Sequence, residues 1–100
     1  MLVDAQGYLR NTDDWTESFV QVTAVELGLT LTEQHWQVLK ISRTLVLKHQ
    51  QILGLRRLVS ALQAAGVTQA SSLYLQRLFP GFTLRIIAKL AGLTKPAQCL

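Results

Sequence analysis

The chain has 100 residues, of which 49% are hydrophobic and 16% charged, with a formal net charge of +4 at pH 7. This length is typical of a single domain, and the high apolar content excludes intrinsic disorder, which requires low hydrophobicity and high net charge. No apolar run reaches the roughly 18–20 residues of a transmembrane helix, so no membrane association is expected. Residues 1–7 lack the basic and apolar regions of a signal peptide, and there is one cysteine. We therefore expect a reducing, cytoplasmic location.

The charges are unevenly divided along the chain. The first 33 residues hold all six acidic residues and one arginine, which gives −5, whereas residues 34–100 hold nine Lys and Arg and no acid, which gives +9. Two interpretations are open. The basic residues pair with the acidic N-terminal third, or they form a basic face for an anionic partner such as nucleic acid, an acidic protein or a thiolate.

The first half of the chain predicts two helices after a short N-terminal region. Apolar and polar residues alternate loosely over residues 1–10, which predicts two short strands around a turn. Capping side chains at 11–14 precede a helix over about 15–27. A second, well-buried helix is predicted over about 33–50, with Thr32 as its N-cap.

The second half predicts three shorter helices, over about 55–65, 73–79 and 83–91, which glycine and proline residues separate. Ser71 and Ser72 are predicted to cap the middle one of the three. Residues 93–100 show no periodicity and contain a proline. The chain is therefore predicted to form a mostly helical domain over residues 1–92, followed by a flexible C-terminal arm over residues 93–100.

The sequence contains few residue patterns that are typical of catalytic or metal-binding sites. His35 and His49 are 14 residues apart, with no cysteine or acid at ligand spacing, so no metal site is expected. The isolated glycines form no phosphate-binding loop, so no cofactor is expected either. His35 is instead predicted to satisfy a backbone group at the start of the second helix, and Trp36 to fill the core.

The single cysteine, Cys99, stands in the predicted arm. Structural cysteines are usually buried in helices or strands, so this position leaves two interpretations open, an incidental surface thiol and a working thiol. The eight residues after Gly92 can extend by about 25–29 Å, enough to bring a thiol into a partner's active site. Nearby cations favour the reactive thiolate, and Lys95 is four residues away, whereas the terminal carboxylate on Leu100 is a like charge that opposes it, so both outcomes stay open.

Four basic residues are candidates for stabilising anionic sulfur or docking a partner: Arg77, Arg85, Lys89 and Lys95. Arg85 and Lys89 stand at i, i+4 on one face of the last predicted helix, whose other face is apolar. The same region allows a competing interpretation, a helix-turn-helix array whose arginines, Arg56 and Arg57 among them, lie over phosphates.

Five segments of the chain carry distinctive motifs, among them a His-Trp pair and a Gly-Leu-x-Lys-Pro-x-x-Cys tail. They are residues 4–9, 15–17, 29–36, 74–80 and 91–100. In this order they resemble the DsrC/TusE family of sulfur carriers. The resemblance implies an α+β but mostly helical fold, an orthogonal helix array with a helix-turn-helix-like part and a small N-terminal β-hairpin or meander.

The resemblance also implies a sulfurtransferase whose sulfur-carrying residue is Cys99. In the TusE branch this cysteine accepts a persulfide from a TusBCD-like donor complex. It relays the sulfur to the enzyme that thiolates the tRNA wobble uridine at C2, which implies proximity to tRNA; another sulfur-metabolism enzyme is the alternative acceptor. In the DsrC branch a second cysteine stands eleven residues upstream. Ala88 occupies that position here, so single-cysteine carriage is predicted, and Thr94 replaces a proline that the family's tail usually has.

Two alternatives stay open. The first is a non-catalytic helix-turn-helix module that binds nucleic acid or regulates, with an incidental cysteine. It predicts nucleic-acid affinity that falls steeply with added salt and does not depend on residues 93–100. The second is an interaction subunit whose tail docks into an enzyme without accepting sulfur.

Overall fold

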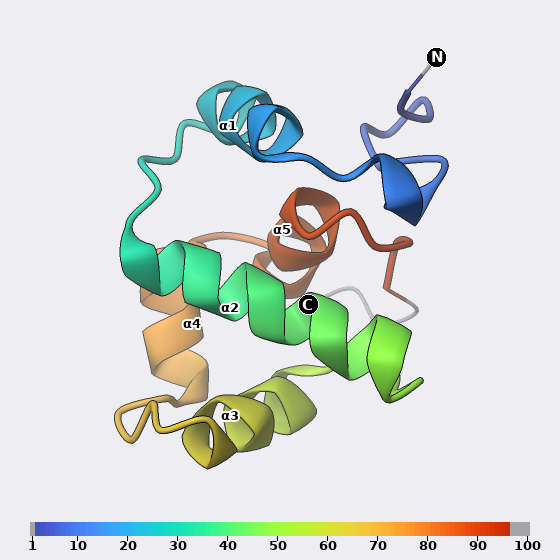
Figure 1. Ribbon diagram of the computed structural model, residues 1–100. Coiled ribbons are helices and arrows are strands. Elements are labelled where there is room, and N and C mark those ends of the chain that lie inside the picture. Colours follow the sequence, from blue (N-terminus) through green and yellow to red (C-terminus); the bar gives the residue numbers. More distant parts are fainter. Residues whose placement is uncertain (1, 97–100) are drawn as a thin grey trace.

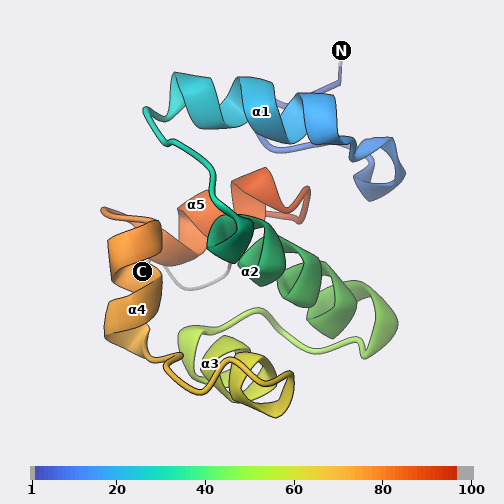
Figure 2. The same cartoon turned by 60° about the vertical axis from the view of Figure 1, so that its left-hand side comes forward.

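The computed structural model describes residues 2–96, which form five α-helices. They are α1 (Glu17–Glu26), α2 (Glu33–Arg43), α3 (Leu55–Ala64), α4 (Ser72–Leu78) and α5 (Thr83–Leu90). Helix α2 is central and contacts α3 and α5, while α1 packs on α5 and α4 packs on α3. Figures 1 and 2 show these helices crossing one another rather than forming a parallel bundle. The prediction of a mostly helical fold with five helices is confirmed.

The second predicted helix changes its geometry before it ends. Regular α-helix stops at Arg43, and a π-helical turn continues over Thr44–Lys48. The hydroxyls of Ser42 and Thr44 each donate to the carbonyl four residues earlier, at 2.7 and 3.1 Å, a pattern that bends helices. Gln50 then takes a positive φ of 54°. Apolar periodicity is preserved through this change, which is why the sequence predicted one helix up to residue 50.

The predicted N-terminal β-hairpin is not seen in the described part of the chain. Val3 and Leu9 form one isolated antiparallel bridge. Between them the Asp4 carboxylate accepts the backbone N–H of Gln6 at 2.9 Å and of Tyr8 at 3.0 Å. A side chain that binds local N–H groups competes with strand pairing, so the segment is a turn closed by a single bridge.

Side-chain caps begin two of the helices. The hydroxyls of Thr16 and Ser71 accept the backbone N–H three residues later, at 3.1 and 3.0 Å, and so start α1 and α4. The capping role predicted around Ser71 is confirmed. The prediction that residues 11–14 cap the first helix is wrong, because these residues form a separate 3-10 turn over Thr12–Asp14.

The start of α2 is joined to the end of α4 by His35, which is buried. Its Nδ1 accepts the backbone N–H of Thr32 at 3.1 Å, so the ring proton is on Nε2, which donates to the Leu78 carbonyl at 2.7 Å. The ring also meets Phe79 edge-on, with the centroids 5.0 Å apart. The predicted backbone role of His35 is confirmed.

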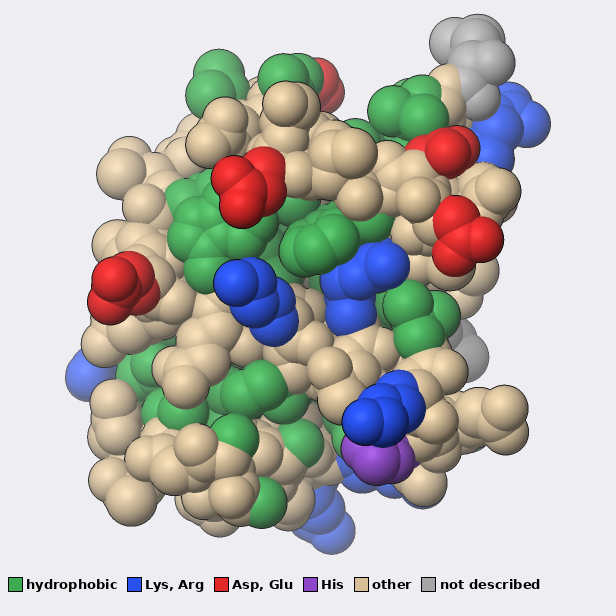
Figure 3. Space-filling view, viewed as in Figure 1, with side chains coloured by type: hydrophobic (Ala, Val, Ile, Leu, Met, Phe, Trp, Pro, Cys, Tyr) green, Lys and Arg blue, Asp and Glu red, His purple; other side chains and the backbone are tan. Residues whose placement is uncertain are grey.

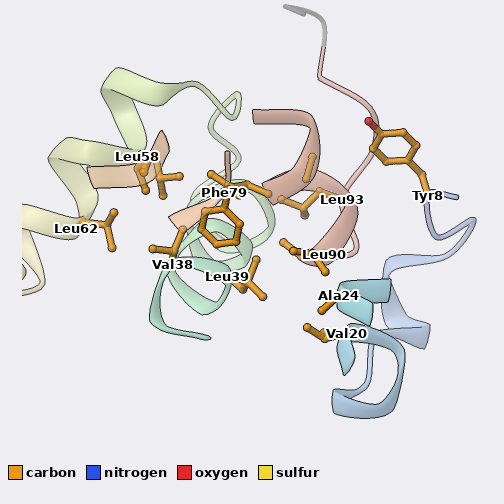
Figure 4. Close-up of a cluster of buried hydrophobic side chains, with 14 of the residues drawn as sticks. Tyr8, Val20, Ala24, Val38, Leu39, Leu58, Leu62, Phe79, Leu90 and Leu93 are labelled. Carbon is orange, nitrogen blue, oxygen red and sulfur yellow. The ribbon is translucent and has the colours of Figure 1, made fainter. Parts of the chain in front are cut away.

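The core is built from the helices and the N-terminal turn together (Figure 4). Its largest fully buried apolar side chains are Phe79, Leu39, Leu58, Leu62, Leu75, Leu84, Ile87 and Leu90. Tyr8 lies at the edge of this cluster in Figure 4. Helix α5 contributes most of one face to the core, which leaves Arg85 and Lys89 on its other side, as predicted.

The division of charge along the chain is kept on the surface. Figure 3 shows acidic side chains near α1, the N-terminal segment and the start of α2, with basic side chains spread over the remainder of this face. Within residues 2–96 no direct ion pair joins the two sets, so internal pairing is supported only by the electrostatic attraction between the Asp13 carboxylate and the Arg43 guanidinium. No helix among these residues is both long enough and apolar enough to cross a membrane.

Replacing the buried histidine tests its role in joining two helices. We expect His35→Leu to lower the free energy of unfolding by about 2–4 kcal/mol, because the Thr32 N–H and the Leu78 carbonyl lose their partner. His49→Leu makes the same change at an exposed position and should stay within about 0.5 kcal/mol of the wild type. Urea denaturation measures both, and equal losses would contradict the assignment.

The hydrogen bonds of the turn around Tyr8 predict that its stability depends on pH. The backbone N–H of Tyr8, more than any other group, holds the pKa of the Asp4 carboxyl below its ordinary value of 3.8. Since the folded pKa is depressed, the turn is stabilised above about pH 3.8 and loses this stabilisation as the pH falls through the folded pKa. An NMR titration should show an Asp4 midpoint below 3.8, with the Gln6 and Tyr8 amide signals moving in parallel. A midpoint at 3.8 or higher would be inconsistent with these bonds.

Candidate functional site

The segment that leads to the predicted arm begins in a fixed geometry at the end of α5. The Leu93 N–H donates to the Ala88 carbonyl at 2.9 Å, and the Gly92 N–H donates to the Lys89 carbonyl at 3.3 Å. Gly92 has a φ of +69°, and Leu93 is buried in the core. This is the Schellman arrangement of a helix C-terminus, so the body of the protein sets the direction in which the chain leaves α5.

Two side chains from distant parts of the sequence cover this helix end. The Trp15 indole donates to the Leu90 carbonyl at 2.8 Å, and Arg43 Nη1 donates to the Ala91 carbonyl at 2.8 Å and to Thr12 Oγ1 at 3.0 Å. The Arg43 guanidinium also lies over the Trp15 ring, 4.3 Å from its centroid. These bonds satisfy carbonyls that the helix leaves free, and partial burial lowers the pKa of Arg43.

An open pocket of about 480 Å³ lies beside this helix end, between α5 and the N-terminal turn. Three of the four predicted basic residues line it, Arg85, Lys89 and Lys95, and none of the acidic residues in the described part of the chain does. Two aromatic rings form part of its wall. The Lys89 Nζ lies 5.1 Å from the Tyr8 ring centroid, and the Arg85 Cζ lies 4.9 Å from the Phe82 ring centroid. The pocket thus combines three positive charges with apolar walls.

The cations of this pocket have no counter-ion in the described part of the chain. Neither Arg85, Lys89 nor Lys95 has a hydrogen-bond or ion-pair partner among residues 2–96, and the Nε of Arg85 is buried without an acceptor. Buried donors without acceptors are uncommon in folded proteins, because each one costs free energy. The pocket is therefore suited to an anion that comes from outside residues 2–96.

The remaining basic candidates lie elsewhere. Arg77 is exposed on α4 and does not line this pocket. Arg56 and Arg57 line a different depression, together with His49. The structure therefore brings together three of the four predicted residues, and it separates the arginines that the helix-turn-helix interpretation combines.

The predicted sulfur carrier, Cys99, lies outside the described residues, and its role stays a prediction. Lys95, four residues before it, is exposed at the pocket. Ala88, at the position of the second cysteine of the DsrC branch, is fully buried. Over residues 2–96 no group of three or more His, Cys, Asp or Glu side chains is placed to hold a metal ion.

Comparison with known proteins decides the family. The family model described as DsrC like protein matches residues 1–100. The chain belongs to the DsrC-like family. Sulfurtransferase TusE from Yersinia pseudotuberculosis serotype I (strain IP32953) is 42% identical over 98 residues, and its counterpart from Sodalis glossinidius (strain morsitans) is 43% identical. Each match covers 97% of this chain and 91% of the relative. The predicted family membership is confirmed. The relatives are named as sulfurtransferases, which is the class that the sequence predicted.

Solved structures of DsrC proteins share the fold. The NMR structure of Allochromatium vinosum DsrC matches with a TM-score of 0.86 and 34% identity, covering 98% of this chain and 88% of that one. The crystal structure of the oxidized gamma-subunit of the dissimilatory sulfite reductase (DsrC) from Archaeoglobus fulgidus matches with a TM-score of 0.75 and 26% identity, covering 98% and 90%. The helix array is therefore the DsrC fold.

Side chains cover the end of α5 in this DsrC-like protein so closely that only glycine fits at position 92. A Cβ there would lie 2.7 Å from Trp15 Cδ1 and 2.8 Å from Leu9 Cδ1. We expect Gly92→Ala to lower the free energy of unfolding by about 2–4 kcal/mol, from backbone strain and overpacking together. Gly28→Ala is the matched control, since Gly28 also has a positive φ, of 72°, but nothing lies within 4 Å of its added Cβ.

The control should lose only about 1–2 kcal/mol, the part that backbone strain contributes. Thermal or urea denaturation of both variants measures the difference. Similar losses at Gly92 and Gly28 would show that the covering side chains do not press on this helix end.

Proposed function

We propose that this DsrC-like protein is a sulfurtransferase that carries sulfur as a persulfide on Cys99. The observation that carries the proposal is the pocket in which Arg85, Lys89 and Lys95 meet, with no counter-ion among residues 2–96, beside the segment that leads to Cys99. The names of the TusE relatives, at 42% and 43% identity, support the same chemistry.

Chain length supports a link between the pocket and the thiol. Cys99 is four residues beyond Lys95, so its Cα stays within about 13–14 Å of the Lys95 Cα. This reach allows the Cys99 sulfur to approach the cations to the roughly 4–6 Å at which a positive charge favours a thiolate over a thiol, and an anionic persulfide likewise. The proposed roles of Arg85, Lys89 and Lys95 are therefore to stabilise anionic sulfur on Cys99 or to hold an anionic group of a partner. Arg77 does not line the pocket, so only the partner role is proposed for it.

The transfer consists of two thiol exchange steps. In the first, the Cys99 thiolate attacks the outer sulfur of the donor persulfide, the donor's S–S bond breaks, and the donor cysteine leaves as a thiolate. In the second, a nucleophilic thiolate of the acceptor attacks the outer sulfur on Cys99, and Cys99 leaves as a thiolate. Each step forms one bond to sulfur and breaks one, so no external oxidant or reductant is needed.

The identity of the partners follows from the family resemblance. We propose a TusBCD-like complex as the donor and a tRNA-thiolating enzyme, acting on the wobble uridine, as the acceptor. The relatives' name, TusE, supports this branch over other sulfur trafficking. Ala88 in place of a second cysteine supports exchange between proteins rather than within this chain. The cytoplasmic location and the helix-turn-helix-like part stay predictions. The flexible arm over 93–100 stays a prediction for the residues after Leu93, which is itself buried in the core.

Replacing the only thiol tests the proposal directly. We expect wild-type protein incubated with a cysteine desulfurase and cysteine to gain one sulfur atom, measured by intact mass and lost on reduction. Cys99→Ser should gain none and keep the same circular dichroism and unfolding midpoint, since serine differs by one atom. A gain of sulfur by Cys99→Ser would contradict the proposal.

A second set of sulfur sources covers the case in which the cysteine desulfurase does not recognise this protein. Protein with a freely alkylatable Cys99 is also offered cysteine persulfide and inorganic polysulfide, which need no docking. If none of the three sources loads the wild type, Cys99 is not a sulfur carrier and the nucleic-acid interpretation takes its place.

A further inference from the structure

A second depression adjoins the basic pocket along α1. It measures about 650 Å³ and is formed by α1 and the N-terminal turn. Gln6, Leu27 and Lys89 line both depressions, so the two form one continuous surface. We call it the docking surface. Its principal side chains are Leu2, Val22, Leu27, Phe82, Arg85 and Lys89.

Exposed apolar side chains lie in both parts of this surface, with Leu2 and Val22 in the depression along α1 and Phe82 in the basic pocket. Leu2, Val22 and Phe82 are 48%, 59% and 61% exposed. Val22 lies on the outer side of α1, whose inner side already packs in the core through residues such as Phe19 and Val20. Large apolar side chains that gather around a depression mark surfaces that a partner covers.

The basic end of the docking surface has unused capacity to bind a carboxylate. A guanidinium binds a carboxylate through two parallel N–H bonds, and Arg85 donates to no acceptor within residues 2–96. Lys89 holds its ammonium over the Tyr8 ring at the junction of the two depressions. A partner's carboxylate at this point would be flanked on one side by the second depression, which we call the apolar groove.

The distribution of charge favours a protein over a nucleic acid as the occupant. The three cations are gathered at one end of the surface, whereas a nucleic acid needs positive charge spread along its phosphates. The depression along α1 also contains an acidic residue, Glu26, which disfavours a row of phosphates along the whole surface but not a single carboxylate held at the basic end. An acidic side chain next to apolar ones, on one protein segment, matches both parts.

We propose that the docking surface binds the protein that exchanges sulfur with this chain, through a segment of that protein that carries carboxylates beside apolar side chains. The apolar side chains occupy the groove at Val22 and Leu27, and a carboxylate pairs with Arg85 and Lys89. Because Lys95 also lines the basic pocket, a partner seated here lies next to the chain that leads to Cys99. The identity of the partner as a sulfur donor or acceptor rests on the proposed function.

The test compares two valines on α1 that differ in position. Val22 lines the groove, whereas Val25, 77% exposed, does not. Val22→Glu and Val25→Glu are each made in the Cys99→Ser background, so that binding is measured without sulfur chemistry. The probes are the purified TusBCD-like donor complex and the purified tRNA-thiolating enzyme, with affinity read by biolayer interferometry.

We expect Val22→Glu to weaken binding to at least one of the two proteins by about tenfold or more, the size of effect seen when a central interface side chain is lost. Val25→Glu should change it by less than about twofold. Arg85→Gln should also weaken binding and reduce its salt dependence, while Arg56→Gln, which removes the same charge from the other basic depression, should not.

Equal affinities of Val22→Glu and Val25→Glu for both proteins would overturn the proposal. So would weakened binding of tRNA by Val22→Glu or Arg85→Gln with binding of both proteins unchanged, which would identify a nucleic-acid surface instead. Loading of Cys99 by cysteine persulfide is measured separately with Cys99 present. Failure of that loading tells against the proposed function and leaves the affinity comparison to decide the docking surface.

Discussion

The covered end of α5 is the constraint on which the site depends. Trp15 and Arg43 bind the last carbonyls of this helix, and they approach so closely that position 92 has no room for a Cβ. A single left-handed residue there turns the chain and buries Leu93. That turn puts Lys95 at the pocket in which Arg85 and Lys89 already lie, so a backbone geometry brings the charges together.

Much of this could be predicted from the sequence because it depends on local periodicity. An apolar repeat close to 3.6 residues identifies α5 and separates its buried face from the face of Arg85 and Lys89. Hydroxyl caps such as Ser71 act within one turn of a helix, so they are equally visible. The role of Cys99 was predicted from its place in a family motif, and its position lies outside the described residues.

Other features could not be predicted, because they join residues that are distant in the sequence. The Trp15 bond to α5 spans 75 residues and the Arg43 bond spans 48, and no local pattern signals either contact. Trp15 was predicted inside the first helix and precedes it instead. The separation of Arg77 from the other basic candidates follows from how α4 packs, and the single bridge at Val3 follows from the Asp4 side chain.

The burial of Ala88 bears on how members of the family differ. This side chain is completely enclosed, and its carbonyl accepts the Leu93 N–H that closes α5. A cysteine introduced at this position would add a sulfur atom to a filled core, and its thiol would be shielded from any arm that approached it. Passing from one-thiol to two-thiol chemistry therefore requires the surroundings of the last helix to change along with the residue. Under the proposed function, the packing around Ala88 therefore favours transfer of sulfur to another protein over bond formation within the chain.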